Sequence, residues 1–412
     1  MMFNPIFWLI IGFILFGFAS DHLLMWLNLQ HAKPDLPEKL NKFYDTDSYN
    51  KAIVYHQQNF RLSFISSLFS TSLLLVLLFT GSFAWLDGQI AQINEYEIIR
   101  ALLFFGILLF ISDILSLPFS IYKTFVIENK FGFNRTSPIL FVKDKLKGWI
   151  LMAILGGGLL SLIIWFYQWT ASWFWLIGWG IMIIVLLFIT IFYTSLFIPL
   201  FNKLLPLEEG HLRSQITAFA NKVAFPLKKI FVMNGSLRSS KANAFFSGLG
   251  GKKSIVLFDT LIDQHSENEL IAVLAHEVGH YKKKHILSGI LLSIGQTGLL
   301  FFLFGLSLNL SELPQALGIA EPSFHISLLV FSFLLTPLMQ LSSFITNAVS
   351  RRNEFQADAF SAKTHGAEHL IDALEKLSVK NLSFPDPHPL FVKMHYSHPP
   401  VFARVEALER LR

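Results

Sequence analysis

Two histidines four residues apart, with a glutamate after the first, lie in the stretch LAHEVGHYKKKH, residues 274–285. Residues i and i+4 share one face of a helix, so His276 and His280 can both reach one metal ion. Glu277 lies ~100° around the helix from His276, which places its carboxylate beside the ion, where it can hold a water molecule. This is the His-Glu-x-x-His arrangement of zinc metallopeptidases.

A catalytic zinc takes three protein ligands and keeps one position for water, so the chain must supply a third ligand. The best source is NEFQAD, residues 353–358, where Glu354 and Asp358 are again four apart on an expected helix. In metallopeptidases with a glutamate as third ligand, the acid one turn further on accepts a hydrogen bond from the first histidine and fixes its orientation. We therefore predict one Zn²⁺ held by His276, His280 and Glu354, with Asp358 supporting His276.

A chance match on a surface helix is the alternative to a metal site. The helix context argues against it, because Ser266 and Glu269 predict a capping box at the helix start. The chain also has no cysteine, which excludes disulfides and a thiolate metal site. His265 and His285, which flank the helix, are interpreted as surface residues rather than ligands. The run Lys282–Lys284 is interpreted as the helix end meeting lipid headgroups.

The segments that carry these residues belong to a strongly apolar chain. Of 412 residues, 53% are hydrophobic and only 15% are charged, against roughly 25% charged in a soluble protein, and the mean hydropathy is +0.52. We expect seven membrane-spanning helices, because seven apolar stretches are long enough to cross a bilayer. The first lacks the basic start of a signal peptide and is interpreted as a retained helix. The stretches lie at about 5–28, 61–87, 99–121, 148–170, 172–200, 286–310 and 323–349.

The basic residues predict the orientation of the chain. Apart from Arg100, the loops alternate between lysine- and arginine-rich segments and segments that lack both. Positive loops stay in the cytoplasm, which predicts an N-terminus outside and both large polar segments inside. The net charge of +5 then reflects a basic face against anionic lipid and requires no nucleic acid. The absence of cysteine favours a bacterial inner membrane.

The predicted fold class is mainly α, a polytopic membrane protein with a cytoplasmic domain that carries the metal site and a small β-sheet. Residues 228–235 are predicted to form one strand, and 243–261 two strands about a glycine-rich turn. Helices are expected after Ser266, over 350–378 and after the Pro-Pro pair at 399–400. The predicted segments are helices one to five with their cytoplasmic loops (1–202), the first part of the cytoplasmic domain (203–285), helices six and seven (286–349) and its second part (350–412).

The chain resembles the type 1 CAAX prenyl protease family, the integral-membrane zinc endopeptidases. The resemblance covers most of the chain and implies seven helices around a large chamber, a gluzincin-type domain and cleavage of a peptide whose C-terminal end can carry a prenyl chain. Its motifs are FVIENKFGFNRTSPILFVKDKLKG (125–148), FIPLFNKLLPLEEGHLR (197–213), NGSLRSSKANAFFSGLGGKKSIVLFDTL (234–261), HEVGH, SRRNEFQADAF (350–360) and SHPPVFAR (397–404).

The resemblance also implies further site residues. It assigns Asn243, with Ala244 and Phe245, to a substrate-binding edge strand, which an extended peptide can pair with. It assigns His398 and Arg404 to the stabilisation of the tetrahedral intermediate, which needs positive or hydrogen-donating groups. From the residues alone, an ordinary core strand, a Pro-Pro turn residue and a surface salt bridge are the respective alternatives.

The chain departs from the family at three positions. Lys241 and Ala242 stand where the family tends to have His-Ser, and Phe245 stands where tyrosine is usual, which leaves the substrate preference open. Asp113 and the pair Asp21–His22 lie within or near the spans, where ionisable groups face a cavity or a partner.

The predicted reaction is peptide hydrolysis by a zinc-activated water, with Glu277 passing the water's proton to the leaving amine. The predicted partners are a peptide or protein substrate, prenylated or membrane-embedded, and the lipid bilayer. A quality-control protease of the same clan is one alternative. Another is a metal-binding transporter or channel, although the chain lacks paired half-repeats. An intramembrane-cleaving protease would carry its zinc motif inside an apolar helix.

Overall fold

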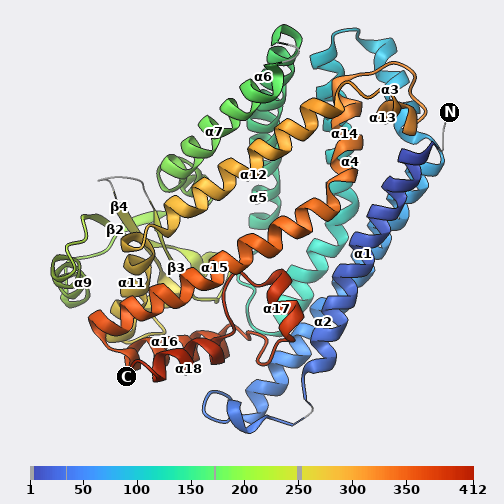
Figure 1. The fold of residues 1–412 in the computed structure, drawn as a ribbon. Helices are drawn as coiled ribbons and strands as arrows, with labels where there is room; N and C mark the ends of the chain where they lie inside the picture. The colour runs from blue at the N-terminus through green and yellow to red at the C-terminus, as the bar shows by residue number, and fades with distance from the viewer. Residues whose placement is uncertain (1–3, 34, 171–172, 248–252) are drawn as a thin grey trace.

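The computed structural model describes residues 4–33, 35–170, 173–247 and 253–412 (Figure 1). Within these ranges, six helices are long and apolar enough to cross a membrane, and one bent pair makes a seventh. This agrees with the seven predicted spans. The six are α1 (Pro5–His31), α2 (Thr46–Phe79), α4 with its π-helical end (Glu97–Glu128), α5–α6 (Pro138–Thr170), α7–α8 (Phe174–Phe201) and α12 (His285–Ser307).

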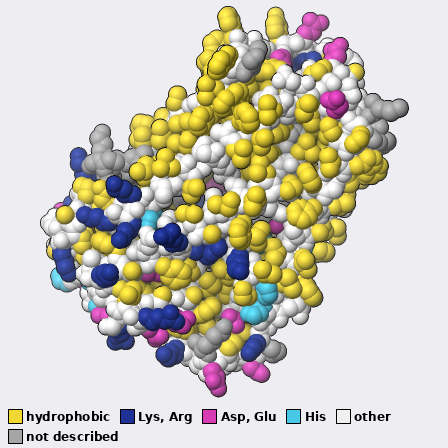
Figure 2. Space-filling model, viewed as in Figure 1, with side chains coloured by type: hydrophobic (Ala, Val, Ile, Leu, Met, Phe, Trp, Pro, Cys, Tyr) yellow, Lys and Arg dark blue, Asp and Glu magenta, His cyan; other side chains and the backbone are white. Residues whose placement is uncertain are grey.

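The helical part of the molecule presents an apolar surface. Ile154, Ile184 and Leu291 each expose at least 60% of their area. Figure 2 shows hydrophobic side chains over the long helices, with Lys and Arg gathered over the end that carries the sheet. Large exposed apolar areas mark surfaces that contact lipid or protein. The fold is therefore a membrane-spanning bundle with a polar domain at one end.

The second predicted span differs from the structure. Helix α2 starts well before the apolar run, at Thr46, where Asp45 accepts a hydrogen bond from the Ser48 N–H at 2.7 Å. It ends at Phe79, because Gly81 turns the chain with a φ of +68° before α3 (Ser82–Ile93) begins. Hydropathy detects only the apolar part of a helix, so it does not reveal that α2 begins within the polar segment before the predicted span.

One helix joins the bundle to the polar domain. Helix α14 (Phe324–Leu334) meets α15 (Thr336–His365) at 58°, and α15 then runs unbroken through the predicted metal segment (Figure 1). The helix predicted over 350–378 is thus the end of α15 followed by α16 (Ala367–Lys380). Gly366, with a φ of +101°, separates the two because few other residues adopt that backbone conformation.

The polar domain contains a four-stranded mixed sheet in the order β1-β2-β4-β3. Strands β2 (Leu227–Met233) and β4 (Lys253–Phe258) are parallel, whereas β1 (Leu204–Pro206) and β3 (Ala244–Ser247) pair antiparallel on the outside. The three predicted strands are present, β1 is additional, and the glycine-rich turn at 248–252 lies outside the described residues. Strand β3 is an edge strand, as predicted.

The helix that carries the histidine pair, α11 (Glu267–Lys282), is packed on two sides. Leu270, Leu274 and Val278 join a core with the sheet and α9 (His211–Lys222), while Ala272 joins a second core with α16 and α18 (Val401–Glu409). Burial on both sides holds this helix rigidly between the two parts of the domain. The remaining short helices are α10 (Asp259–Ile262), α13 (Glu312–Ala316) and α17 (Pro389–His395).

Candidate metal centre

The close approach of α11 and α15 positions the candidate ligands. Gly279 lies at the contact, and a Cβ there would sit 3.0 Å from the Cα of Ala357 and 3.1 Å from its carbonyl oxygen. Such distances are tighter than most real Cβ contacts, so a larger residue would force the backbone of α15 away by a few tenths of an ångström. The glycine of His-Glu-Val-Gly-His therefore allows ligands on two helices to meet.

The start of α11 is capped as predicted. The Ser266 hydroxyl accepts the Glu269 N–H, and the Glu269 carboxylate accepts the Ser266 N–H. Glu269 also accepts from Lys376 and lies 2.9 Å from His265 Nδ1. The prediction of a surface position for His265 is wrong, because its side chain is fully buried. The histidine belongs to the buried network that fixes the helix start.

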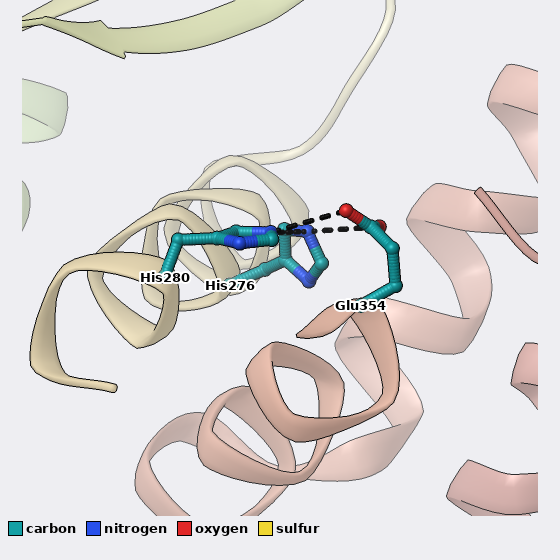
Figure 3. A group of neighbouring side chains, drawn as sticks. All are labelled: His276, His280 and Glu354. Carbon is teal, nitrogen blue, oxygen red and sulfur yellow. Dashed lines mark hydrogen bonds and ion pairs between the residues drawn. The ribbon is translucent and has the colours of Figure 1, made fainter. Parts of the chain in front are cut away.

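Three ligand atoms converge between α11 and α15 (Figure 3). The Nε2 atoms of His276 and His280 lie 3.0 Å apart. Glu354 places Oε1 3.2 Å from His280 Nε2 and Oε2 3.5 Å from His276 Nε2. Ligands at the Zn–N and Zn–O distances of a tetrahedral site are about 3.3 Å apart. Two imidazole nitrogens and a carboxylate that face one another need a proton or a metal cation between them, and this donor set with this spacing fits a divalent metal.

A second layer of contacts orients His276. Its Nδ1 lies 2.8 Å from Asp358 Oδ1. The Arg404 guanidinium binds the same carboxylate with two hydrogen bonds, from Nε to Oδ2 at 2.8 Å and from Nη2 to Oδ1 at 2.6 Å. All three side chains are at most 9% exposed. The carboxylate thus fixes the ring so that Nε2 faces the ligand group.

Burial and neighbouring charges shift the pKa values of the groups on α11 and α18. Burial lowers the pKa of His276, but hydrogen bonds to Asp358 and Glu354 outweigh it and raise the pKa to about 9. Burial raises the pKa of Glu277, opposed by the charges of His276 and His280. Burial lowers the pKa of Arg404, but Asp358 raises it overall, so the guanidinium stays charged.

The structure also brings His398 and Arg404 to the ligand group. His398 Nδ1 lies 2.9 Å from Glu354 Oε2, and Arg404 Nη1 lies 3.4 Å from the same oxygen. The His398 side chain is 65% exposed, whereas Arg404 is buried. His398 can therefore meet a ligand from outside, while much of the hydrogen-bonding capacity of Arg404 is used by Asp358.

Strand β3 contacts α11, and its outer edge pairs with no other strand of the described residues; we call this its free edge. The Asn243 carbonyl accepts the Phe258 N–H at 3.1 Å, so Asn243 and Phe258 form a hydrogen-bonded pair of the sheet. Hydrogen-bonded and non-hydrogen-bonded pairs alternate along antiparallel strands. The backbone N–H and carbonyl of the next residue, Ala244, therefore point away from β4, toward the free edge. The outward Ala244 N–H is bound by the Asn243 side-chain oxygen at 2.9 Å. Phe245 stacks its ring edge-on to Tyr193.

The departure at Lys241 is accommodated by contacts with α2 and with the π-helical end of α4. Its Nζ donates to the Tyr55 hydroxyl at 2.8 Å and to Glu128 at 3.2 Å, and it lies 4.2 Å from the centre of the Phe133 ring. Ala242 beside it is buried. The lysine thus ties the segment before β3 to the membrane helices.

Several contacts were not predicted from the sequence. His285 is 8% exposed and touches His280, so its interpretation as a surface residue is wrong. Asp87 binds Arg100 and His325. The only sign of this group in the sequence is Arg100, which departs from the alternation of basic and non-basic loops. Asp113 is expected to face a cavity or a partner, and it has both: it binds Lys145 at 2.8 Å and lines a cavity of about 830 Å³.

The pair Asp21–His22 divides between a cavity and the packed bundle. Asp21 lines a cavity of about 610 Å³. His22 is buried at 9% exposure and packs against Phe18 and Phe64.

The bundle and the buried His-His-Glu group together define an integral-membrane metallopeptidase. Residues 206–412 match the family model described as "Peptidase family M48", and residues 25–203 match "CAAX prenyl protease N-terminal, five membrane helices". The chain belongs to peptidase family M48. A peptidase of this family acts on peptide or protein substrates, and this membership removes the grounds for the transporter alternative.

Individual relatives agree with this family. "CAAX prenyl protease 1 homolog" of Arabidopsis thaliana is 36% identical over 97% of this chain and 96% of its own length. "CAAX prenyl protease 1" of Saccharomyces cerevisiae is 33% identical, covering 97% and 94%, and the human homologue is 34% identical, covering 92% and 89%. The crystal structure of S. mikatae Ste24p superposes with a TM-score of 0.94 at 32% identity, over 99% of this chain and all of that one.

Proposed function

We propose that this chain is a zinc metalloendopeptidase that cleaves peptides near their C-terminus, including peptides that carry a prenyl group. The meeting of His276 and His280 from α11 with Glu354 from α15 carries the proposal, since two imidazoles and a carboxylate are a donor set of catalytic zinc. Bound zinc would polarise the scissile carbonyl and lower the pKa of a water molecule. The prenyl group is proposed from the relatives described as CAAX prenyl proteases.

The chain's own residues would divide the remaining work. Glu277 holds the attacking water and moves its proton to the leaving amine; its raised pKa suits a base that must then act as an acid. His398, mostly exposed beside Glu354, donates to the oxygen that develops negative charge. Arg404 adds positive charge there and orients His276 through Asp358.

The substrate would bind as an added strand. The Ala244 N–H and carbonyl lie on the free edge of β3, and an extended peptide that pairs there must first displace the Asn243 side chain. The side chain of Phe245 is partly buried and packs against Tyr193 and Phe258. Strand β3 itself contacts α11, the helix that carries the histidine pair, which supports this edge as the substrate site.

We further propose that the polar domain faces the cytoplasm, with the N-terminus outside, in a bacterial inner membrane. The gathering of Lys and Arg at the sheet end of the molecule supports this orientation (Figure 2). The lack of cysteine suits a bacterial host.

The test compares the purified protein with its Glu277→Gln variant on a fluorogenic peptide with and without a farnesyl group. We expect chelator-sensitive cleavage by the wild type, a loss of at least 10²-fold in the variant, and one zinc per chain in both. Equal activity in both proteins would overturn the mechanism. Faster cleavage of the farnesylated peptide supports the prenyl-peptide substrate, and indifference to the farnesyl group favours general proteolysis.

A further inference from the structure

His285 is the first residue of α12 and lies against the last turn of α11. Its Nδ1 is 3.0 Å from His280 Nδ1, and its Nε2 is 3.0 Å from Gln356 Oε1. A continuous helix would place a residue five positions on about 140° away from His280. The chain instead turns at Lys284, whose φ is +59°, and this break returns the His285 ring to His280.

The hydrogen bonds that link His280, His285 and Gln356 determine which nitrogen of each imidazole carries the proton. His280 must leave Nε2 bare to hold a metal, so its proton is on Nδ1 and is donated to His285 Nδ1. The His285 proton is then on Nε2, where it needs an acceptor. The amide oxygen of Gln356 can only accept, and it lies at that position. The metal position at His280 and the amide oxygen of Gln356 therefore require the same tautomers of the two histidines.

The arrangement gives each candidate metal imidazole a partner behind its ring. His276 has the Asp358 carboxylate at 2.8 Å, and His280 has the buried imidazole of His285, supported by Gln356. Helix α15 thus supplies Glu354, Gln356 and Asp358 from a single stretch. His285 is not a further ligand, because it meets His280 on Nδ1, on the opposite side of the ring from Nε2.

We propose that His285 and Gln356 are positioning residues that hold His280 in its Nδ1-protonated form, with Nε2 directed at a divalent metal. The inference rests on the proposed metallopeptidase function. Groups that orient metal-binding histidines typically change metal affinity 10–100-fold when they are removed. The structure predicts this effect for two residues that do not themselves reach the metal.

The test measures the zinc dissociation constant of the full-length protein in detergent, by competition with a chromophoric chelator. We expect His285→Leu and Gln356→Met, which remove the acceptors, to weaken zinc binding about 10–100-fold. His285→Asn keeps an oxygen near the former Nδ1 and should stay within about threefold of the wild type. The visible spectrum of the Co²⁺-substituted protein should change in the Leu and Met variants and remain unchanged in the Asn variant.

His265→Asn is the matched control, because His265 is a buried histidine at the other end of α11 that does not contact the ligand group. It should lower thermal stability without changing zinc affinity. Wild-type affinity in both His285→Leu and Gln356→Met, or equal loss in His285→Asn and His285→Leu, would overturn the inference. If His285→Leu does not fold, the zinc affinity of Gln356→Met tests the inference, because Gln356 is only half-buried. Failure of the wild type to bind zinc would instead overturn the proposed function.

Discussion

Arg404 binds both carboxylate oxygens of Asp358, with Nε at 2.8 Å from Oδ2 and Nη2 at 2.6 Å from Oδ1. Such bidentate pairs are strong and fix the plane of the carboxylate. Asp358 in turn meets His276 Nδ1 at 2.8 Å. An arginine predicted to meet the reaction intermediate therefore also holds the imidazole of a candidate metal ligand in place.

Replacing Arg404 by lysine separates charge from geometry. Arg404→Lys keeps the positive charge but cannot form two parallel hydrogen bonds to Asp358. We expect zinc affinity to fall about 10–100-fold, with a matching loss of activity at limiting zinc, measured by chelator competition. Arg410→Lys, which alters an exposed pair with Glu406, should behave as the wild type. Wild-type zinc affinity with lost turnover would show that Arg404 acts on the intermediate alone.

The parts of this site that follow a helical period could be predicted from the sequence. His276 and His280, and likewise Glu354 and Asp358, are four residues apart, and that spacing alone places each pair on one face. The capping box of Ser266 was equally local. Only the meeting of the two helices required more than spacing, and the small residue Gly279 marks where it occurs.

The contacts that the sequence did not reveal join distant elements. His325 meets Asp87 from 238 residues further along the chain, and no local period connects them. The predicted surface position of His285 is wrong because a left-handed residue, Lys284, breaks the helix before it and turns its ring back to His280. Arg404 reaches Asp358 because α18 packs on α16 and α11, a contact between elements far apart in the sequence.

The ion pair at Asp87 predicts a stability effect far from the metal. Asp87 is 6% exposed and accepts two hydrogen bonds from Arg100, and His325 lies at 2.7 Å. Asp87→Asn leaves the Arg100 charge without its counter-ion, which we expect to destabilise the fold by about 3 kcal/mol. The measurement is thermal unfolding in detergent. Restoration of part of the lost stability by adding Arg100→Gln would confirm the cause.

The control for that experiment is Lys42→Gln. Lys42 and Glu409 form an ion pair whose side chains are 73% and 47% exposed, and such pairs contribute at most about 1 kcal/mol. An equal change in melting temperature for Asp87→Asn and Lys42→Gln would contradict the idea that the buried pair ties α3 to α4 and α14.

The raised pKa of His276 predicts a pH dependence in the metal-free protein. The pKa of His276 is about 9 in the folded state, whereas a histidine without these partners, as in the unfolded chain, has a pKa of 6.5. A pKa that is higher in the folded state stabilises the fold fully below pH 6.5, and this contribution, at most on the order of 3 kcal/mol, is lost as pH rises to 9. We expect the melting temperature of the chelated protein to fall over this window, and to fall less in His276→Asn. Parallel profiles for the two proteins would contradict the assignment.

The free edge of β3 predicts a selective effect on substrate binding. Ala244→Pro removes the outward N–H without removing a bond inside the sheet, which an edge strand tolerates. Loss of one backbone hydrogen bond costs about 1 kcal/mol, so we expect KM for a peptide to rise about fivefold at unchanged zinc content, measured by steady-state kinetics. Ala244→Val keeps the N–H and is the control for side-chain size. Wild-type KM in the proline variant would show that the substrate does not pair with this edge, and the Asn243 side chain that now binds the Ala244 N–H would then be a permanent cap of the strand.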